Sequence, residues 1–429
     1  MLESEEAVQT NRKAVWSWCL YDFANSPFTT LIVTFIYASY FTAEIAPDSN
    51  TGTIYWSRGV TITAIVVAAL SPFMGALADL GGLRKRLLLS TTLICVLATA
   101  GLFFVLPGQI MGALTLFVVG NIAFEMGMVF YNAFLPDIAP AEKVGRISGI
   151  GWGLGYVGGL LALVVALVGF IQPEQPWFGF STEQSVRATC LLTAVWFAVF
   201  SIPIFLWVPE EKPQPRESSS IVKDSMSQLV QTFRDLRQYR QIMRFLIARL
   251  LYNDGLITVF AFGGIYATGT FGFEIKEILV FGIVLNIAAG AGAFAMGFMD
   301  DVLGGKMTIQ ISLVGLLVAT IIAVTAPNAT VFWIGGILVG IFSGPNQSAS
   351  RSLMGRMVPD DKENEFFGFF AFSGKATAFL GPTMFGLFTG IFDTQRAGVA
   401  SVILLLVAGW WVLQGVDEGE GIRLASRKA

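Results

Sequence analysis

The sequence predicts an all-α polytopic membrane protein, with twelve transmembrane helices in two pseudo-symmetric six-helix halves. Two properties of the composition predict the membrane class. Of the 429 residues, 54% are hydrophobic and only 13% are charged, and the mean hydropathy is +0.67. Soluble domains carry about 25% charged residues and need polar surface to cover their core. A loop motif that occurs twice predicts the two halves.

Twelve apolar stretches are long enough to cross a bilayer. A helix needs about 20 mostly apolar residues to span roughly 30 Å of hydrocarbon. We expect the spans at residues 15–43, 55–78, 87–106, 110–134, 147–171, 188–208, 243–268, 276–299, 307–326, 330–355, 366–391 and 396–415. An even number of spans places both termini on the same side of the membrane.

Lysine and arginine are distributed unevenly between the two sides. The segments on the side of the termini contain Arg12, Lys13, Arg84, Lys85, Arg86, Lys143, Arg146, Lys306, Arg356 and Lys362. The segments on the opposite side contain Arg58, Arg187, Lys276 and Arg396. Because basic residues favour cytoplasmic loops, we expect a multi-pass protein of the cell (inner) membrane with both termini in the cytoplasm.

The loop between the second and third spans recurs between the eighth and ninth, 222 residues later. The first copy comprises Gly75, Asp79, Gly82 and Arg84, and the second comprises Gly297, Asp301, Gly304 and Lys306. Segments around Pro140 and Pro359 form another similar pair, 219 residues apart. We therefore divide the chain into an N-terminal half (1–208), a linker (209–242) and a C-terminal half (243–429).

The linker combines a flexible beginning with an amphipathic pattern. Its first residues are rich in proline and serine, which is typical of a solvated connection. One helical face then carries Val222, Met226, Leu229, Phe233 and Leu236, bordered by Arg234, Arg237 and Arg240. This pattern predicts either a helix on the inner leaflet or a helix that packs on the protein.

The repeated loop resembles the signature of the major facilitator superfamily, in which Gly-x-x-x-Asp-x-x-Gly precedes basic residues. Leu80 and Leu83 stand where that signature is basic, so the basic residues move to Arg84–Arg86. The resemblance implies two six-span halves that rock against each other. It also implies a gating role for the repeated loops, through Gly75, Asp79, Gly82, Arg84, Asp301 and Lys306.

Three further segments resemble a narrower group, the vacuolar-effluxer-like branch of that superfamily. They are Tyr21–Phe28 in span 1, Tyr131–Asp137 after span 4 and Arg249–Gly255 in span 7. Members of this branch are bacterial relatives of the autophagy-linked vacuolar amino-acid exporter of fungi. The resemblance therefore implies export of an amino acid.

Polar side chains inside the first four spans are candidates for binding solute or protons. An ionisable group within a span costs at least about 2.5–3.5 kcal/mol, so it needs a partner or a water-filled cavity. Asp22 and Asn25 share a helical face in span 1, and Asn121, Glu125 and Asn132 fall at helical spacing in span 4. We favour Glu125 as a proton-coupling acid. The alternative for Asp22 is a capped or paired structural acid, and the alternative for Glu125 is an ion pair that locks two helices.

The C-terminal half adds a second set of candidates. Span 7 contains Arg249, Asn253 and Asp254, span 10 contains Ser343, Asn346 and Gln347, and span 11 contains Lys375. Lys375 could neutralise Asp22, Glu125 or Asp254, or bind the carboxylate of a solute. The polar residues of span 10 suit a polar solute, although such residues also link neighbouring helices.

Several function classes are disfavoured. The chain has no histidine, and its three cysteines lie singly in apolar stretches, so zinc sites and Ser-His-Asp triads are not expected. There is no P-loop motif. We expect no enzyme activity, cofactor, metal or nucleic acid, and a monomer in the lipid bilayer.

The predicted function is secondary active transport of a small polar solute by alternating access. We expect an amino acid or related metabolite, moved by efflux, with protons as a candidate coupling ion. The alternatives are a transporter of drugs, sugars or lipid-like molecules, and a membrane receptor or scaffold that does not transport.

Overall fold

The computed structural model describes residues 11–172, 177–209, 221–234 and 238–426, and within these ranges every regular element is helical. The N-terminal half comprises α1 (Arg12–Pro27), η1 (Phe28–Phe35), α2 (Ile36–Tyr40), η2 (Phe41–Ile45), α3 (Ser49–Gly81), α4 (Arg84–Gly101), η3 (Leu102–Phe104), α5 (Ile110–Ala133), α6 (Leu135–Ile138), η4 (Ala141–Lys143), α7 (Val144–Ala166), η5 (Leu167–Ile171), η6 (Trp177–Gly179) and α8 (Thr182–Trp207). The linker contains α9 (Ile221–Arg234).

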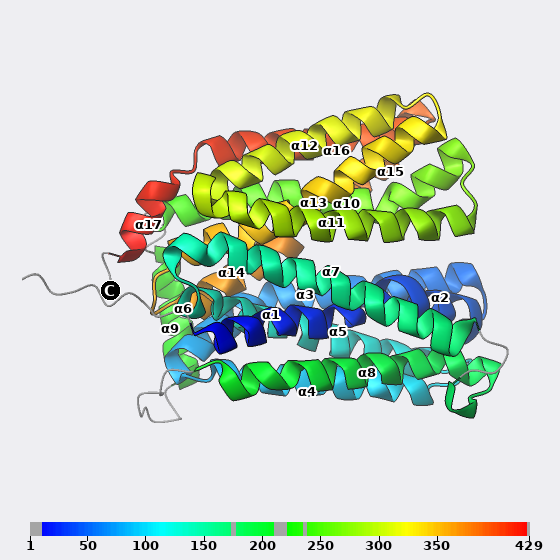
Figure 1. The fold of residues 1–429 in the computed structure, drawn as a ribbon, viewed down its shortest axis with the longest axis horizontal. Helices are drawn as coiled ribbons and strands as arrows, with labels where there is room; N and C mark the ends of the chain where they lie inside the picture. The colour runs from blue at the N-terminus through cyan, green and yellow to red at the C-terminus, as the bar shows by residue number, and fades with distance from the viewer. Residues whose placement is uncertain (1–10, 173–176, 210–220, 235–237, 427–429) are drawn as a thin grey trace, which may run out of the picture.

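The C-terminal half has longer uninterrupted helices, apart from one span that is divided. It comprises α10 (Arg240–Phe271), α11 (Ile275–Leu303), α12 (Gly305–Thr325), α13 (Ala329–Met357), α14 (Glu363–Lys375), α15 (Leu380–Phe392), α16 (Gln395–Gln414) and α17 (Glu418–Ser426). In Figure 1, α1 to α8 lie together in the lower part, and most of the C-terminal half lies above them, with α14 at the boundary.

The eleventh expected span is two helices rather than one. Within the described ranges, eleven helices are long and apolar enough to cross a membrane, whereas residues 366–391 are divided between α14 and α15 by a turn at residues 376–379. Pro382 lies in the first turn of α15 and favours the division, because its ring would clash with the carbonyl of Ala378 in a straight continuous helix. The all-α fold is confirmed, and the number of twelve membrane-spanning helices stays a prediction.

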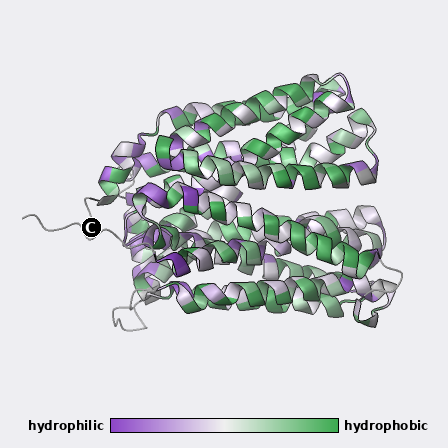
Figure 2. Ribbon diagram, in the orientation of Figure 1, coloured by the Kyte–Doolittle hydropathy of each residue, from purple (hydrophilic) through white to green (hydrophobic). Residues whose placement is uncertain are grey.

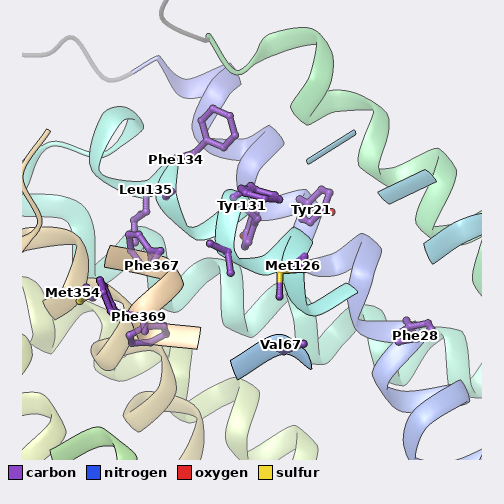
Figure 3. Close-up of a cluster of buried hydrophobic side chains, with 14 of the residues drawn as sticks. Tyr21, Phe28, Val67, Met126, Tyr131, Phe134, Leu135, Met354, Phe367 and Phe369 are labelled. Atoms are coloured by element: carbon purple, nitrogen blue, oxygen red, sulfur yellow. The ribbon is translucent and has the colours of Figure 1, made fainter. Parts of the chain in front are cut away.

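Polar residues gather at the two ends of the molecule, and apolar residues cover the lengths of the helices (Figure 2). We call the end that carries the start of α1, the linker helix α9 and the C-terminal helix α17 the linker end (Figure 1). A buried cluster lies there between the halves, with Tyr131, Phe134 and Leu135 from one half and Met354 and Phe367 from the other (Figure 3). The two halves therefore share a packed core at the linker end.

The linker helix packs on the protein through a face that carries Ser225, Gln228, Leu229 and Thr232. Ser225 and Thr232 of α9 are buried, and the Gln228 side-chain amide donates a hydrogen bond to Glu365 at 2.7 Å. Burial raises the pKa of the Glu365 carboxyl. Met226 is exposed on the other face of α9. The expected packing on protein is thus present, contact of the apolar face with the inner leaflet stays a prediction, and Leu236 lies outside the described residues.

Candidate functional site

An ion pair joins α5 of the N-terminal half to α14 of the C-terminal half. The Lys375 ammonium nitrogen of α14 lies 2.7 Å from a carboxylate oxygen of Glu125 in α5. The two side chains remain 21% and 28% exposed, respectively. Lys375 is the last residue of α14, so its side chain projects beside the break in span 11. Of the three acids considered for Lys375, the structure brings Glu125 to it.

Polar residues of α10 and α13 lie next to this pair. The Gln347 amide donates to the Asn253 side-chain oxygen at 3.0 Å, and the Asn253 amide donates to the Gly374 carbonyl at 3.3 Å. Arg249 donates to the Phe370 carbonyl at 2.7 Å and the Ser373 hydroxyl at 2.8 Å. Spans 7, 10 and 11 therefore meet where Lys375 emerges.

Asp254 faces the other end of the break. Its carboxylate accepts a hydrogen bond at 2.9 Å from the backbone N–H of Gly381, in the first turn of α15. The Asp254 side chain is buried, and its second oxygen has no hydrogen-bond partner. Asp254 of α10 therefore contacts the start of α15, whereas Asn253 contacts the end of α14.

Three other predicted site residues contact groups other than Glu125 and Lys375, and a fourth is buried. Asn346 donates to the Ser312 hydroxyl at 3.1 Å inside the C-terminal half, and the Ser343 hydroxyl donates to the Gly340 carbonyl of its own helix. The Asn25 amide lies 3.5 Å from the Met128 sulfur, and Asn121 is buried. Asn25 and Asn121 thus lie on or beside α5, the helix that carries Glu125, whereas Asn346 bonds inside the C-terminal half.

A second charged cluster joins the halves nearer the linker end. Arg351 of α13 donates to the Asp22 carboxylate of α1 at 2.9 Å, and both side chains are buried. The same guanidinium reaches Asn132 at 3.4 Å, and Ser148 through its hydroxyl at 2.9 Å and its carbonyl at 2.8 Å. One arginine thus binds three elements of the other half.

Aromatic rings enclose this arginine. The Arg351 guanidinium carbon lies 4.6 Å from the centre of the Trp18 ring and 5.6 Å from that of Trp152. Trp18 in turn stacks on Tyr131 with 4.7 Å between ring centres. Sequence reasoning missed Arg351, although a basic residue inside the expected span 330–355 was a signal that it needs a partner.

The first copy of the repeated loop reaches across to the C-terminal half. The Asp79 carboxylate accepts hydrogen bonds from the backbone N–H groups of Asn364 at 3.0 Å and Glu365 at 2.8 Å. These are unpaired donors in the first turn of α14, so Asp79 caps that helix from the other half. Arg84 pairs with Glu363 at 3.0 Å and with Asp137. Burial raises the pKa of the Glu363 carboxyl, an effect that Arg84 opposes.

The second copy makes the matching contact in the opposite direction. The Asp301 carboxylate accepts from the backbone N–H of Arg146 at 3.0 Å, in the first turn of α7, and from its side chain at 2.9 Å. Lys306 differs, because its ammonium donates to the Gln414 carbonyl within its own half. Each half thus caps a helix of the other, and Lys306 takes no part in that contact.

Gly75 allows the close approach of the halves, and its replacement tests how tightly they fit. A Cβ at Gly75 would lie 2.1 Å from the Asn364 carbonyl oxygen. We expect Gly75→Ala to destabilise the protein by about 1–3 kcal/mol, because overpacking forces the backbones apart. Thermal unfolding of the purified protein measures this loss. Gly112→Ala, whose Cβ meets open space, is the control and is expected to stabilise slightly; equal effects would contradict a tight contact at Gly75.

Comparison with known proteins identifies the family. Residues 49–426 match the family described as Vacuole effluxer Atg22 like. The chain belongs to this family. It is 28% identical over 405 residues to the Uncharacterized MFS-type transporter YxiO of Bacillus subtilis, with 94% of each chain covered. It is 23% identical to Autophagy-related protein 22 of Yarrowia lipolytica, over 85% of this chain and 75% of the relative.

Solved structures agree on the fold. The major facilitator proton:xylose symporter XylE superposes with a TM-score of 0.75 at 13% identity, covering 97% of this chain and 98% of that one. The human organic anion transporter MFSD10 superposes with a TM-score of 0.70 at 12% identity, covering 94% and 99%. The expected major facilitator fold is confirmed, and this Atg22-like protein is a multi-pass membrane transporter rather than an enzyme.

Proposed function

We propose that this Atg22-like transporter exports a small zwitterionic solute, an amino acid or a close relative, by alternating access. The observation that carries the proposal is the Glu125–Lys375 pair, which lies between the halves and retains partial exposure. An amino acid carries one carboxylate and one ammonium group. It can therefore replace the pair with two equivalent ion pairs, its carboxylate on Lys375 and its ammonium on Glu125.

The contacts at the linker end support alternating access. Arg351, Asp79 and Asp301 each bind the opposite half, so rocking of the halves must break all three sets of contacts. We propose that these contacts form the inner gate, that the linker end is cytoplasmic as the distribution of basic residues predicts, and that the solute leaves through the opposite end. The description of the family as vacuole effluxers is in keeping with export.

Protons are the proposed coupling ion. A proton on Glu125 neutralises the carboxylate that the ammonium of the solute would bind, so a proton and a solute cannot both occupy Glu125. Loss of the proton restores the carboxylate, and a solute can then bind between Glu125 and Lys375. Because the solute and the proton compete for the Glu125 carboxylate, the transporter can exchange one for the other, with no further ionisable group required.

Stabilisation by ligands tests the solute class. We expect zwitterionic amino acids to raise the melting temperature of the purified protein, because a ligand at 100 times its Kd stabilises the folded state by about 2.7 kcal/mol. Matched compounds that lack either the carboxylate or the ammonium group are expected to do so much less. Stabilisation by a sugar or an apolar drug, with none by any amino acid, would contradict the proposal.

Flux measurements test the transport step. Proteoliposomes loaded with an unlabelled stabilising amino acid should accumulate the labelled form by counterflow, and an imposed pH gradient should change the net rate. Protein-free liposomes are the control. Binding without counterflow would instead indicate a receptor, and flux that ignores the pH gradient would remove the proton from the scheme.

A further inference from the structure

The break in span 11 is held at both of its ends by one segment of α10. Asn253 donates to the Gly374 carbonyl, one of the last four of α14, and Arg249 donates to the Ser373 hydroxyl in the same turn and to the Phe370 carbonyl one turn earlier. Asp254 accepts from the Gly381 N–H in the first turn of α15. The four last carbonyls and four first N–H groups of any helix lack partners within that helix. A broken helix inside a membrane therefore needs another element to supply such partners.

The charges on this segment match the polarity of the two helix ends. The C-terminal end of a helix carries partial negative charge and its N-terminal end partial positive charge. Arg249 places a cation at the end of α14, with its guanidinium carbon 3.5 Å from the centre of the Phe370 ring. Asp254 places a carboxylate at the start of α15. Their order along α10 follows the order of the two helix ends.

We propose that Arg249, Asn253 and Asp254 are positioning residues that keep span 11 broken and thereby hold Lys375 opposite Glu125. This inference rests on the proposed role of that pair in binding solute. Lys375 is the final residue of α14, so the direction of its side chain depends on where α14 stops. If α14 and α15 joined into one longer helix, or if the end of α14 frayed, the Lys375 ammonium would move away from Glu125.

The same arrangement makes α14 a link between the inner gate and the solute. Asp79 of the N-terminal half caps its first turn, and Lys375 at its last turn meets Glu125 of that half. Its 13 residues span about 20 Å at 1.5 Å per residue. Because the break separates α14 from α15, α14 is able to move with the gate while α15 stays in place. When Asp79 releases the first turn of α14, the resulting movement of α14 also displaces Lys375.

Cross-linking tests the positioning without any transport or solute. The variant Glu125→Cys with Lys375→Cys is reacted in nanodiscs with a short bifunctional thiol reagent, and the three native cysteines are all buried. We expect Asp254→Ala to slow the cross-linking about five-fold, the population change that accompanies loss of one helix cap. Asp254→Asn should restore most of the rate, because its amide oxygen still accepts from the Gly381 N–H.

The control separates positioning from general destabilisation. Asn346→Ala also removes a buried hydrogen bond of the C-terminal half, to Ser312, but touches neither end of the break, so its cross-linking rate should stay unchanged. Asn253→Ala replaces Asp254→Ala if the latter does not fold, with the same expected slowing. If Asp254→Ala and Asn253→Ala both cross-link as fast as Asn346→Ala, the inference is overturned. If the rate falls but no amino acid binds, the positioning stands and the proposed solute class fails.

Discussion

Replacing Asp22 with asparagine is expected to open the linker end and to lower the melting temperature sharply. The change leaves the Arg351 guanidinium buried with its charge uncompensated, and removing one partner of a buried ion pair costs about 3–5 kcal/mol. Arg351 binds α1, α5 and α7 from α13. Separation of the halves hydrates the arginine, so part of that cost is relieved by opening rather than by unfolding.

Distances between spin labels at the linker end measure the opening. Glu142 and Asp360 are exposed residues of opposite halves, and labels on cysteines at these positions should report longer distances in Asp22→Asn than in the parent protein. Glu420→Gln is the matched control. It breaks the Arg240–Glu420 pair, which is more exposed and lies within one half, so it should leave both the distances and the melting temperature almost unchanged.

The double variant Asp22→Asn with Arg351→Gln distinguishes charge from contact. Replacing both partners removes the buried charge, so we expect much of the lost melting temperature to return. The distances should nevertheless stay long, because the double variant lacks the hydrogen bonds by which Arg351 joins α13 to the other half. Unchanged distances in a folded Asp22→Asn protein would show that Arg351 does not hold the linker end closed.

The sequence identified most of the charged residues that join the halves but not their partners. The spacing of the repeated loops pointed to Asp79 and Asp301, because spacing is a local property. Their partners, the first turns of α14 and α7, lie far away along the chain. Asp22 and Asn25 were grouped because they share a helical face, yet Asp22 binds Arg351 and Asn25 faces Met128. Which helices face each other is set by tertiary packing.

The break in span 11 shows a different limit. Hydropathy averages over many residues, so residues 366–391 have the pattern of one apolar span, although Pro382 disfavours a straight helix through this point. The position of Lys375 at the end of a helix follows from that break. From the sequence, the charge of Lys375 left three acids as possible partners. The structure shows that Glu125 is the one that pairs with it. Asp254, grouped with the solute-binding residues, instead caps α15.

Neutralising either member of the Glu125–Lys375 pair is expected to reduce transport sharply while leaving stability almost unchanged. Because both side chains are partly exposed, loss of their ion pair should cost about 0–1 kcal/mol. A hydrogen bond from a charged group to solute is stronger, about 1.5–3 kcal/mol. Lys375→Gln should therefore weaken amino-acid binding by about 10- to 150-fold, as measured by ligand-induced shifts in melting temperature.

The two variants should fail in different ways. Lys375→Gln removes the group that binds the carboxylate, so compounds with only an ammonium group should lose less affinity than amino acids do. Glu125→Gln removes the group that binds the ammonium and the proton. It should weaken amino-acid binding and also make any remaining flux independent of the pH gradient. Flux in Glu125→Gln that still follows the gradient would remove Glu125 from proton coupling.

Exchanging the two charges separates a solute site from a structural lock. Glu125→Lys combined with Lys375→Glu retains an ion pair between α5 and α14 with the acid and the base exchanged. If the pair only locks the two helices together, this variant should transport almost as well as the parent protein. A solute site differs, because the neighbouring groups are not exchanged. Arg249 stays beside residue 375 and close to a carboxylate that has been moved there. We therefore expect the exchanged protein to keep its melting temperature and to lose counterflow, and full counterflow would indicate the lock.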